Sequence, residues 1–99
     1  MGKIRHSRQD LFYEAVLAMN TAEECRRFFE DLCTIKELQA MNQRFQVACL
    51  LDEGKNYMEV CDATGASSAT ISRVNKCLTY GAGGYRQVLD RLREGEESQ

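Results

Sequence analysis

The sequence predicts an all-α domain of six helices, in which the fourth and fifth form a helix-turn-helix. Apolar residues recur three and four positions apart along most of the chain, which is the spacing of one helical face, and no alternating strand pattern is present. The chain of 99 residues contains no proline, so nothing interrupts long helices. Residues 57–76 place small, glycine and apolar positions in the order that two crossing helices require.

The first two helices are predicted from their apolar faces and one capping signal. Thr21-Ala-Glu-Glu24 is a capping-box pattern, in which a hydroxyl and a carboxylate bind free backbone N–H groups at a helix start. It opens the second helix. The apolar face of the first helix consists of Leu11, Phe12, Ala15, Val16 and Met19, and that of the second consists of Cys25, Phe28, Phe29 and Leu32.

The third helix is predicted to be more apolar than one buried face requires. Thr34-Ile-Lys-Glu37 repeats the capping pattern and opens a helix that runs to about Glu53 and ends at Gly54. Its second half carries apolar residues almost all round its axis, at Phe45, Val47, Ala48, Cys49, Leu50 and Leu51. Such a helix must be buried on several sides. A small domain gains core by self-association, so we expect a homodimer whose interface includes Phe45, Ala48, Leu51 and parts of the first two helices.

The fourth and fifth helices are predicted at about residues 57–64 and 68–78. Cys61 is the small residue expected where the two helices approach, and Gly65 permits the positive φ of a sharp turn. The residues expected to face inward are Val60, Ala66, Ile71, Val74 and Leu78. Residues 80–84 then break the pattern, and Tyr85, Val88, Leu89 and Leu92 form the apolar face of the last helix.

The outward face of the fifth helix carries the predicted function. Its side chains are short near the helix start and basic near its end, which suits insertion into the major groove of double-stranded DNA. The candidate DNA contacts are Ser67, Ser68, Ala69, Thr70, Ser72, Arg73 and Lys76. The structural alternative is a helix hairpin whose Ser/Thr cluster only caps the second helix.

Charge is distributed unevenly along the chain. The net charge is −2, yet residues 1–9 form a basic arm with Lys3, Arg5, His6 and Arg8, while residues 94–99 form an acidic tail. The arm either contacts DNA or is merely solvated. The acidic balance keeps a second function open, a helical protein-interaction module that has lost DNA binding.

Other classes of protein are disfavoured. The single histidine, His6, has no nucleophile partner at a useful spacing, and no phosphate loop is present, so we expect no enzyme activity. The five cysteines form no C-x-x-C pair, so we expect no metal site. Cys25, Cys49, Cys61 and Cys77 lie among apolar neighbours, so we expect small, buried, reduced thiols with a structural role. No apolar run approaches the roughly 20 residues of a membrane span. We expect one cytoplasmic domain covering residues 1–99 with no membrane partner.

The order of helices and the sequence Gly65-Ala-Ser-Ser-Ala-Thr-Ile-Ser-Arg73 resemble the Trp repressor family, and most closely its YerC/YecD-type members. Thr34 and Arg44 also fall on a Thr and an Arg of that pattern. The resemblance covers about residues 11–92. It implies an intertwined homodimer and a transcriptional regulator, of the repressor kind, that binds operator DNA through the helix starting near Ser67.

The resemblance also implies an effector pocket, formed by Thr34, Arg44, Arg73, Val74 and Cys77. In the family an amino-acid corepressor lies between two arginines, and Arg44 and Arg73 match them. Val74 stands where the family has glycine, and an isopropyl group fills the space that a flat indole ring would use. The sequence therefore disfavours L-tryptophan as a ligand, and we expect no cofactor and an effector of unknown chemistry.

Overall fold

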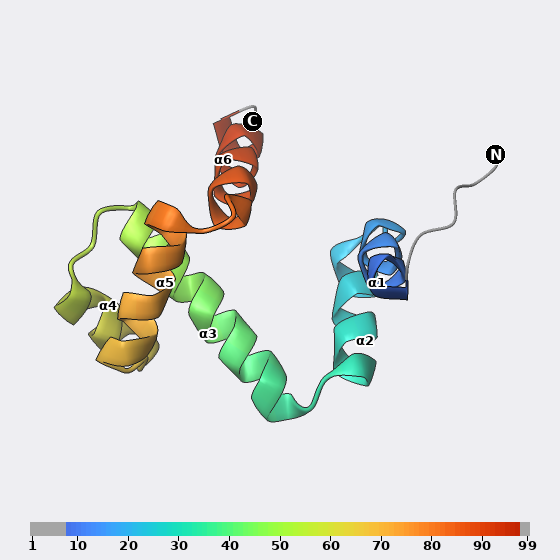
Figure 1. Ribbon diagram of the computed structural model, residues 1–99, viewed down its shortest axis with the longest axis horizontal. Helices are drawn as coiled ribbons and strands as arrows, with labels where there is room; N and C mark the ends of the chain where they lie inside the picture. Colours follow the sequence, from blue (N-terminus) through green and yellow to red (C-terminus); the bar gives the residue numbers. More distant parts are fainter. Residues whose placement is uncertain (1–7, 98–99) are drawn as a thin grey trace. The chain divides into compact units, whose positions relative to one another are not determined.

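The computed structural model describes residues 8–97, which form six α-helices joined by short connections (Figure 1). The helices are α1 (Arg8–Leu17), α2 (Ala22–Leu32), α3 (Ile35–Asp52), α4 (Tyr57–Thr64), α5 (Ser68–Tyr80) and α6 (Gly84–Glu97). No strand occurs within these residues. The predicted all-α fold of six helices is confirmed. Lys3, Arg5 and His6 of the basic arm lie outside the described residues, as do residues 98–99 of the acidic tail.

The chain divides into two compact units, residues 1–38 and residues 39–99, which we call unit 1 and unit 2. Unit 1 contains two capped helix starts, those of α2 and α3. Thr21 Oγ1 accepts the Glu24 N–H at 3.1 Å, and the Glu24 carboxylate accepts the Asn20 N–H at 2.8 Å. Thr34 and Glu37 exchange both bonds of a capping box, at 2.8 and 3.0 Å. Both capping signals therefore begin helices where the sequence predicted them.

Aromatic rings supply the main packing of unit 1. Phe12 and Tyr13 of α1 and Phe28 and Phe29 of α2 form a cluster with ring centroids 5.4 to 6.4 Å apart. Every residue of unit 1 whose burial the structure describes keeps at least part of its surface exposed. Unit 1 thus has an aromatic cluster but no buried core.

Unit 2 contains the hydrophobic core. The hairpin of α4 and α5 packs against the second half of α3, and α6 closes the cluster (Figure 1). The buried residues are Val47, Ala48, Val60, Ala66, Ile71, Val74 and Leu89. The four hairpin positions among them were all predicted to face inward, and Leu78 packs against them half-buried.

The α5 helix ends later than predicted, at Tyr80 instead of Leu78. The Gly81 N–H donates to the Cys77 carbonyl at 2.9 Å and extends the helical bonding. A Cβ on Gly81 would lie 2.4 Å from the same carbonyl oxygen, so only glycine allows the chain to leave the helix so closely.

Two of the predicted buried thiols are exposed, so the expectation was wrong for Cys61 and Cys77. Successive residues point about 100° apart round a helix. Because Val60 and Leu78 take the inward positions, their neighbours in sequence are directed away. Cys49 is half-buried, and burial, reinforced by nearby carboxylates, raises the pKa of its thiol, which keeps it in the unreactive protonated form.

The expectation that Ala48 lies at a subunit interface was also wrong. Ala48 is 0% exposed within the single chain, so it has no surface to offer a partner. Its small side chain lies where the hairpin packs on α3, beside the equally buried Val47. Phe45 and Leu51 are only half-buried and keep surface for such an interface.

Candidate nucleic-acid interface

Hydrogen-bonded caps fix both ends of α4. Asn56 and Glu59 exchange the two bonds of a capping box, each 2.9 Å long. At the other end Gly65 adopts φ 74°, and its N–H donates to the Cys61 carbonyl at 2.8 Å. The sequence predicted the role of Gly65 but missed the box, although Asn-x-x-Glu before an apolar residue is a usable helix-start signal.

Thr64 holds the turn between α4 and α5. Its hydroxyl donates to the Val60 carbonyl at 2.8 Å and accepts the Ala66 N–H at 3.1 Å. Its carbonyl accepts a hydrogen bond from the Gln43 side-chain amide of α3 at 3.2 Å. Sequence reasoning missed Gln43, since the contact joins residues 21 positions apart and no local pattern marks it.

Two hydroxyls at the start of the predicted reading helix, those of Ser67 and Thr70, are engaged in its cap. Ser67 Oγ accepts the Thr70 N–H at 3.1 Å and lies 3.2 Å from the Thr70 hydroxyl. Thr70 is half-buried. Capping, the structural alternative for this Ser/Thr cluster, therefore accounts for these two residues.

The other five candidate contacts are exposed together on α5. They are Ser68, Ala69, Ser72, Arg73 and Lys76. Ala69, Ser72 and Lys76 are spaced three and four apart, so they share the face opposite the buried Ile71 and Val74. Within residues 8–97 neither Arg73 nor Lys76 forms an ion pair. Hydroxyls, one methyl group and two available cations are chemically suited to base edges and phosphates.

The five residues of the predicted effector pocket have different environments. Val74 is 2% exposed and belongs to the core, as predicted. Arg44 and Arg73 are exposed on α3 and α5. The Thr34 hydroxyl, in unit 1, is engaged in the cap of α3. Cys77 alone among the five lines the pocket described next.

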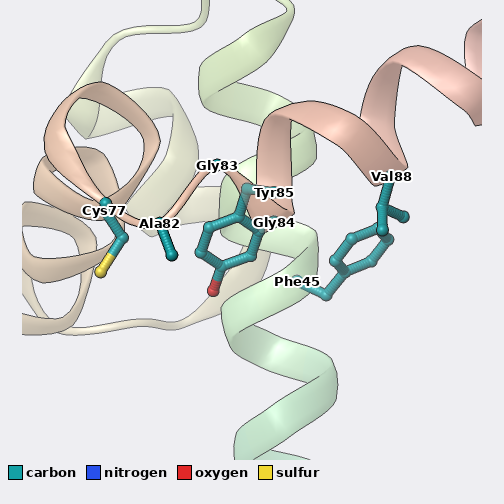
Figure 2. Close-up of a pocket in the computed structure, with 8 residues that line it drawn as sticks. Phe45, Cys77, Ala82, Gly83, Gly84, Tyr85 and Val88 are labelled. Atoms are coloured by element: carbon teal, nitrogen blue, oxygen red, sulfur yellow. The ribbon is translucent and has the colours of Figure 1, made fainter.

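An open apolar pocket of about 480 Å³ lies in unit 2 between α3, the end of α5 and the start of α6 (Figure 2). Phe45 and Tyr85 stack across it with ring centroids 6.5 Å apart. The remaining lining residues are Cys77, Gly81, Ala82, Gly83, Gly84 and Val88. None of these side chains carries a charge, so the pocket suits apolar contacts and offers no oppositely charged partner for a carboxylate or ammonium group.

An ion-pair network fastens α6 to the end of α3. The Asp52 carboxylate accepts from Arg86 at 2.6 Å and also from Arg93, and Asp90 lies 3.1 Å from Arg86. The Asp52 side chain is only 10% exposed. The Arg86 hydrogen bond lowers the pKa of Asp52, and the bond from Arg93 acts the same way against the opposing effect of burial. The sequence could suggest the Arg86–Asp90 pair within α6, but not the tertiary contact with Asp52.

Residues 8–97 contain no group of three His, Cys, Asp or Glu side chains placed to hold a metal ion. No helix among them is long and apolar enough to cross a membrane.

Comparisons with known proteins place this fold. The family profile "Trp repressor protein" matches residues 7–93. The uncharacterized protein YerC of Bacillus subtilis (strain 168) is 48% identical over 94 residues, covering 95% of this chain and 90% of YerC. A crystal structure of a TrpR-like protein from Eubacterium eligens ATCC 27750 matches with a TM-score of 0.81 and 46% identity, over 84% of this chain and 86% of that one. A Trp repressor candidate from Staphylococcus aureus matches with a TM-score of 0.85 and 42% identity, over 90% of this chain and 89% of that one. The chain therefore belongs to the Trp repressor family.

Proposed function

We propose that the protein is a sequence-specific transcriptional regulator that binds double-stranded DNA as a homodimer through α4 and α5. The observation that carries the proposal is the exposed outer face of α5, which stands on a capped hairpin whose inner face is buried. Family membership supports the same function. A dimer on an operator would block access by other proteins, so we propose repression in the bacterial cytoplasm.

Each exposed residue of α5 has a defined part in this proposal. The α5 helix enters the major groove with Ser68, Ala69 and Ser72 at base edges. The hydroxyls donate or accept, and the alanine methyl group meets a thymine methyl group. Arg73 and Lys76 bind phosphates, which supplies affinity and its salt dependence. Ser67 and Thr70 act through the cap that fixes the helix start.

The dimer is supported by the apolar surface that a single chain leaves exposed. Leu17 of α1 is 84% exposed and Leu32 of α2 is 52% exposed. Exposed apolar side chains in such number mark a surface that a partner covers. We propose that a second copy covers α1, α2 and the half-buried Phe45 and Leu51. Two hairpins related by a two-fold axis would then contact two half-sites.

Binding of L-tryptophan is not part of this proposal. The family pocket needs an open floor between two arginines, and here Val74 occupies that position as a core residue, 2% exposed. We propose that the unliganded dimer already binds DNA, and that any effector differs from tryptophan.

Selection from a pool of random DNA duplexes tests the proposal. The parent protein should enrich a palindrome with half-sites about one helical turn, roughly 10 base pairs, apart. Ser72→Glu places a negative charge on the proposed reading face and should abolish enrichment. Gln87→Glu makes the same charge change at an exposed position of α6 and should leave enrichment intact. A parent protein that enriches no sequence would favour the protein-interaction module instead.

A further inference from the structure

We infer that Gln43 is a positioning residue for DNA reading, because it fixes the turn of the hairpin to α3; this role rests on the proposed function. The Gln43 side-chain amide donates to the Thr64 carbonyl at 3.2 Å. Within residues 8–97, this is the hydrogen bond that joins α3 to the hairpin. It links the body of unit 2 to the segment from which α5 starts.

The sequence of α3 directs Gln43 toward the hairpin. Gln43 precedes the fully buried Val47 by four residues, so the two side chains lie on the same face of α3. Val47 contributes to the core at the base of the hairpin, and Gln43 reaches the turn one helical turn away. Gln43 thus lies at the edge of the apolar contact between α3 and the hairpin.

The acceptor is well placed to control the start of α5. The Thr64 carbonyl belongs to the last turn of α4, where carbonyl groups have no partner within the helix. The Thr64 hydroxyl also accepts the N–H of the buried Ala66. Because α5 begins at Ser68, a shift of Thr64 relative to α3 is carried directly to Ser68 and Ala69.

The core restrains this shift without fixing its direction. Val47 and Ala48 of α3 are buried with the hairpin residues, and larger half-buried side chains of the same helix pack against them. Apolar contact has no preferred direction. A hydrogen bond weakens steeply when its angle departs from linear, so it fixes position as well as distance. Binding sites require placement within about 0.5 Å of the productive geometry. Contacts with base edges should therefore depend on Gln43 more than phosphate contacts do.

Two variants remove the donor while keeping the length of the side chain. Gln43→Met has no polar group, and Gln43→Glu offers only acceptors when ionised. Gln46→Glu, at an exposed position of the same helix, is the control for the charge change. Affinity is measured by fluorescence anisotropy for the duplex selected by the parent protein and for a scrambled duplex at one salt concentration. Hydrogen exchange at the Ala66 amide is measured without DNA.

The expected result is a loss of discrimination. Both Gln43 variants should lose about three- to tenfold of the preference for the selected duplex, the effect of one hydrogen bond. Their affinity for the scrambled duplex should stay at the parent value, and the Ala66 amide should exchange faster. Gln46→Glu should match the parent in all three measurements.

Other results overturn the inference in distinguishable ways. If Gln43→Met keeps the parent's preference, or weakens binding to both duplexes equally, Gln43 has only a structural role. An unchanged exchange rate at Ala66 would show that the bond does not hold the turn. A parent protein without any preference would overturn the proposed function itself, and with it the role of Gln43, before a variant is measured.

Discussion

Units 1 and 2 differ in how far they bury their apolar residues. Unit 2 buries Ile71 to 1% exposure, and all the buried residues of the described chain belong to this unit. In unit 1, Leu17 is 84% exposed and Ile35 is 75% exposed. Both units have well-capped helices, so the difference lies in tertiary packing and not in helix formation.

The comparison separates two sources of stability. Unit 2 closes a small core within one chain and presents the α5 face from it. Unit 1 packs four aromatic rings together but leaves Leu17, Leu32 and Ile35 largely in water. A small domain with so much exposed apolar surface is only marginally stable on its own. We infer that unit 1 supplies most of the proposed assembly surface and that unit 2 supplies the DNA-reading surface, and the predictions below test that division.

The largest expected effect comes from charging the exposed surface of unit 1. Leu32→Asp should dissociate the dimer, because burying an unpaired carboxylate in an apolar interface costs several kcal/mol. Sedimentation and the concentration dependence of the thermal midpoint measure the assembly. Met58→Asp, at a 74% exposed position of α4, is the control and should leave the dimer intact. A parent protein that is a folded monomer at micromolar concentration would contradict the division of roles.

A deletion in the core of unit 2 should have the next largest effect. Ile71→Ala should lower the free energy of unfolding by about 2–5 kcal/mol, since it removes packed methyl groups and leaves a cavity. Met58→Ala removes a similar volume from an exposed site and should change it by less than about 0.5 kcal/mol. Denaturant titration of both variants measures the difference. Equal losses would mean that the hairpin core is not the stable part of the chain.

Removing one lysine from each unit should show which unit binds DNA phosphates. Lys76→Ala in α5 should weaken binding to all duplexes alike and reduce the slope of log affinity against log salt by about one. Lys36→Ala in unit 1 removes the same charge from an exposed site and should keep the parent slope. Binding curves at several salt concentrations give both slopes. If Lys36→Ala changes the slope as much as Lys76→Ala, unit 1 also binds phosphate.

The Asp52 network predicts a modest acid sensitivity of unit 2. The Arg86 hydrogen bond lowers the pKa of Asp52 from its ordinary value of 3.8. The stabilisation is therefore complete above pH 3.8 and is lost as the pH falls through the lower folded-state pKa. Asp52→Asn should remove this loss, whereas Asp31→Asn, on the exposed surface of α2, should retain it. Unfolding curves between neutral and strongly acidic pH measure the loss of unfolding free energy. If Asp52→Asn loses as much stability in acid as the parent does, the network does not have this role.

The smallest expected effect is that of L-tryptophan. Because Val74 is a buried core residue and we propose that it fills the family's ligand position, millimolar L-tryptophan should change DNA affinity less than about threefold, or ~0.7 kcal/mol. Val74→Gly should open space, and it should cost more than the roughly 0.5–1 kcal/mol of helix propensity because it also removes a side chain from the core. Titration calorimetry checks both proteins. Saturable micromolar binding by the parent would restore tryptophan as the effector.

Local signals in the sequence were sufficient to predict the helices and the inner face of the hairpin. Thr21 and Thr34 begin helices by side-chain bonds to residues three positions away, and Gly65 turns the chain through its own backbone freedom. Their three-residue spacing identified Ile71 and Val74 as inward residues, and the helix-turn-helix pattern identified Val60. These features depend on neighbours in sequence, so the sequence displays them directly.

Only the tertiary structure decided which residues meet across long separations. Burial of Ala48 follows from how the hairpin packs on α3, which no local pattern specifies. The contacts of Gln43 with Thr64 and of Asp52 with Arg86 join residues 21 and 34 positions apart. Such pairs are selected by the packing of whole helices, and a single sequence carries no periodic signal for them.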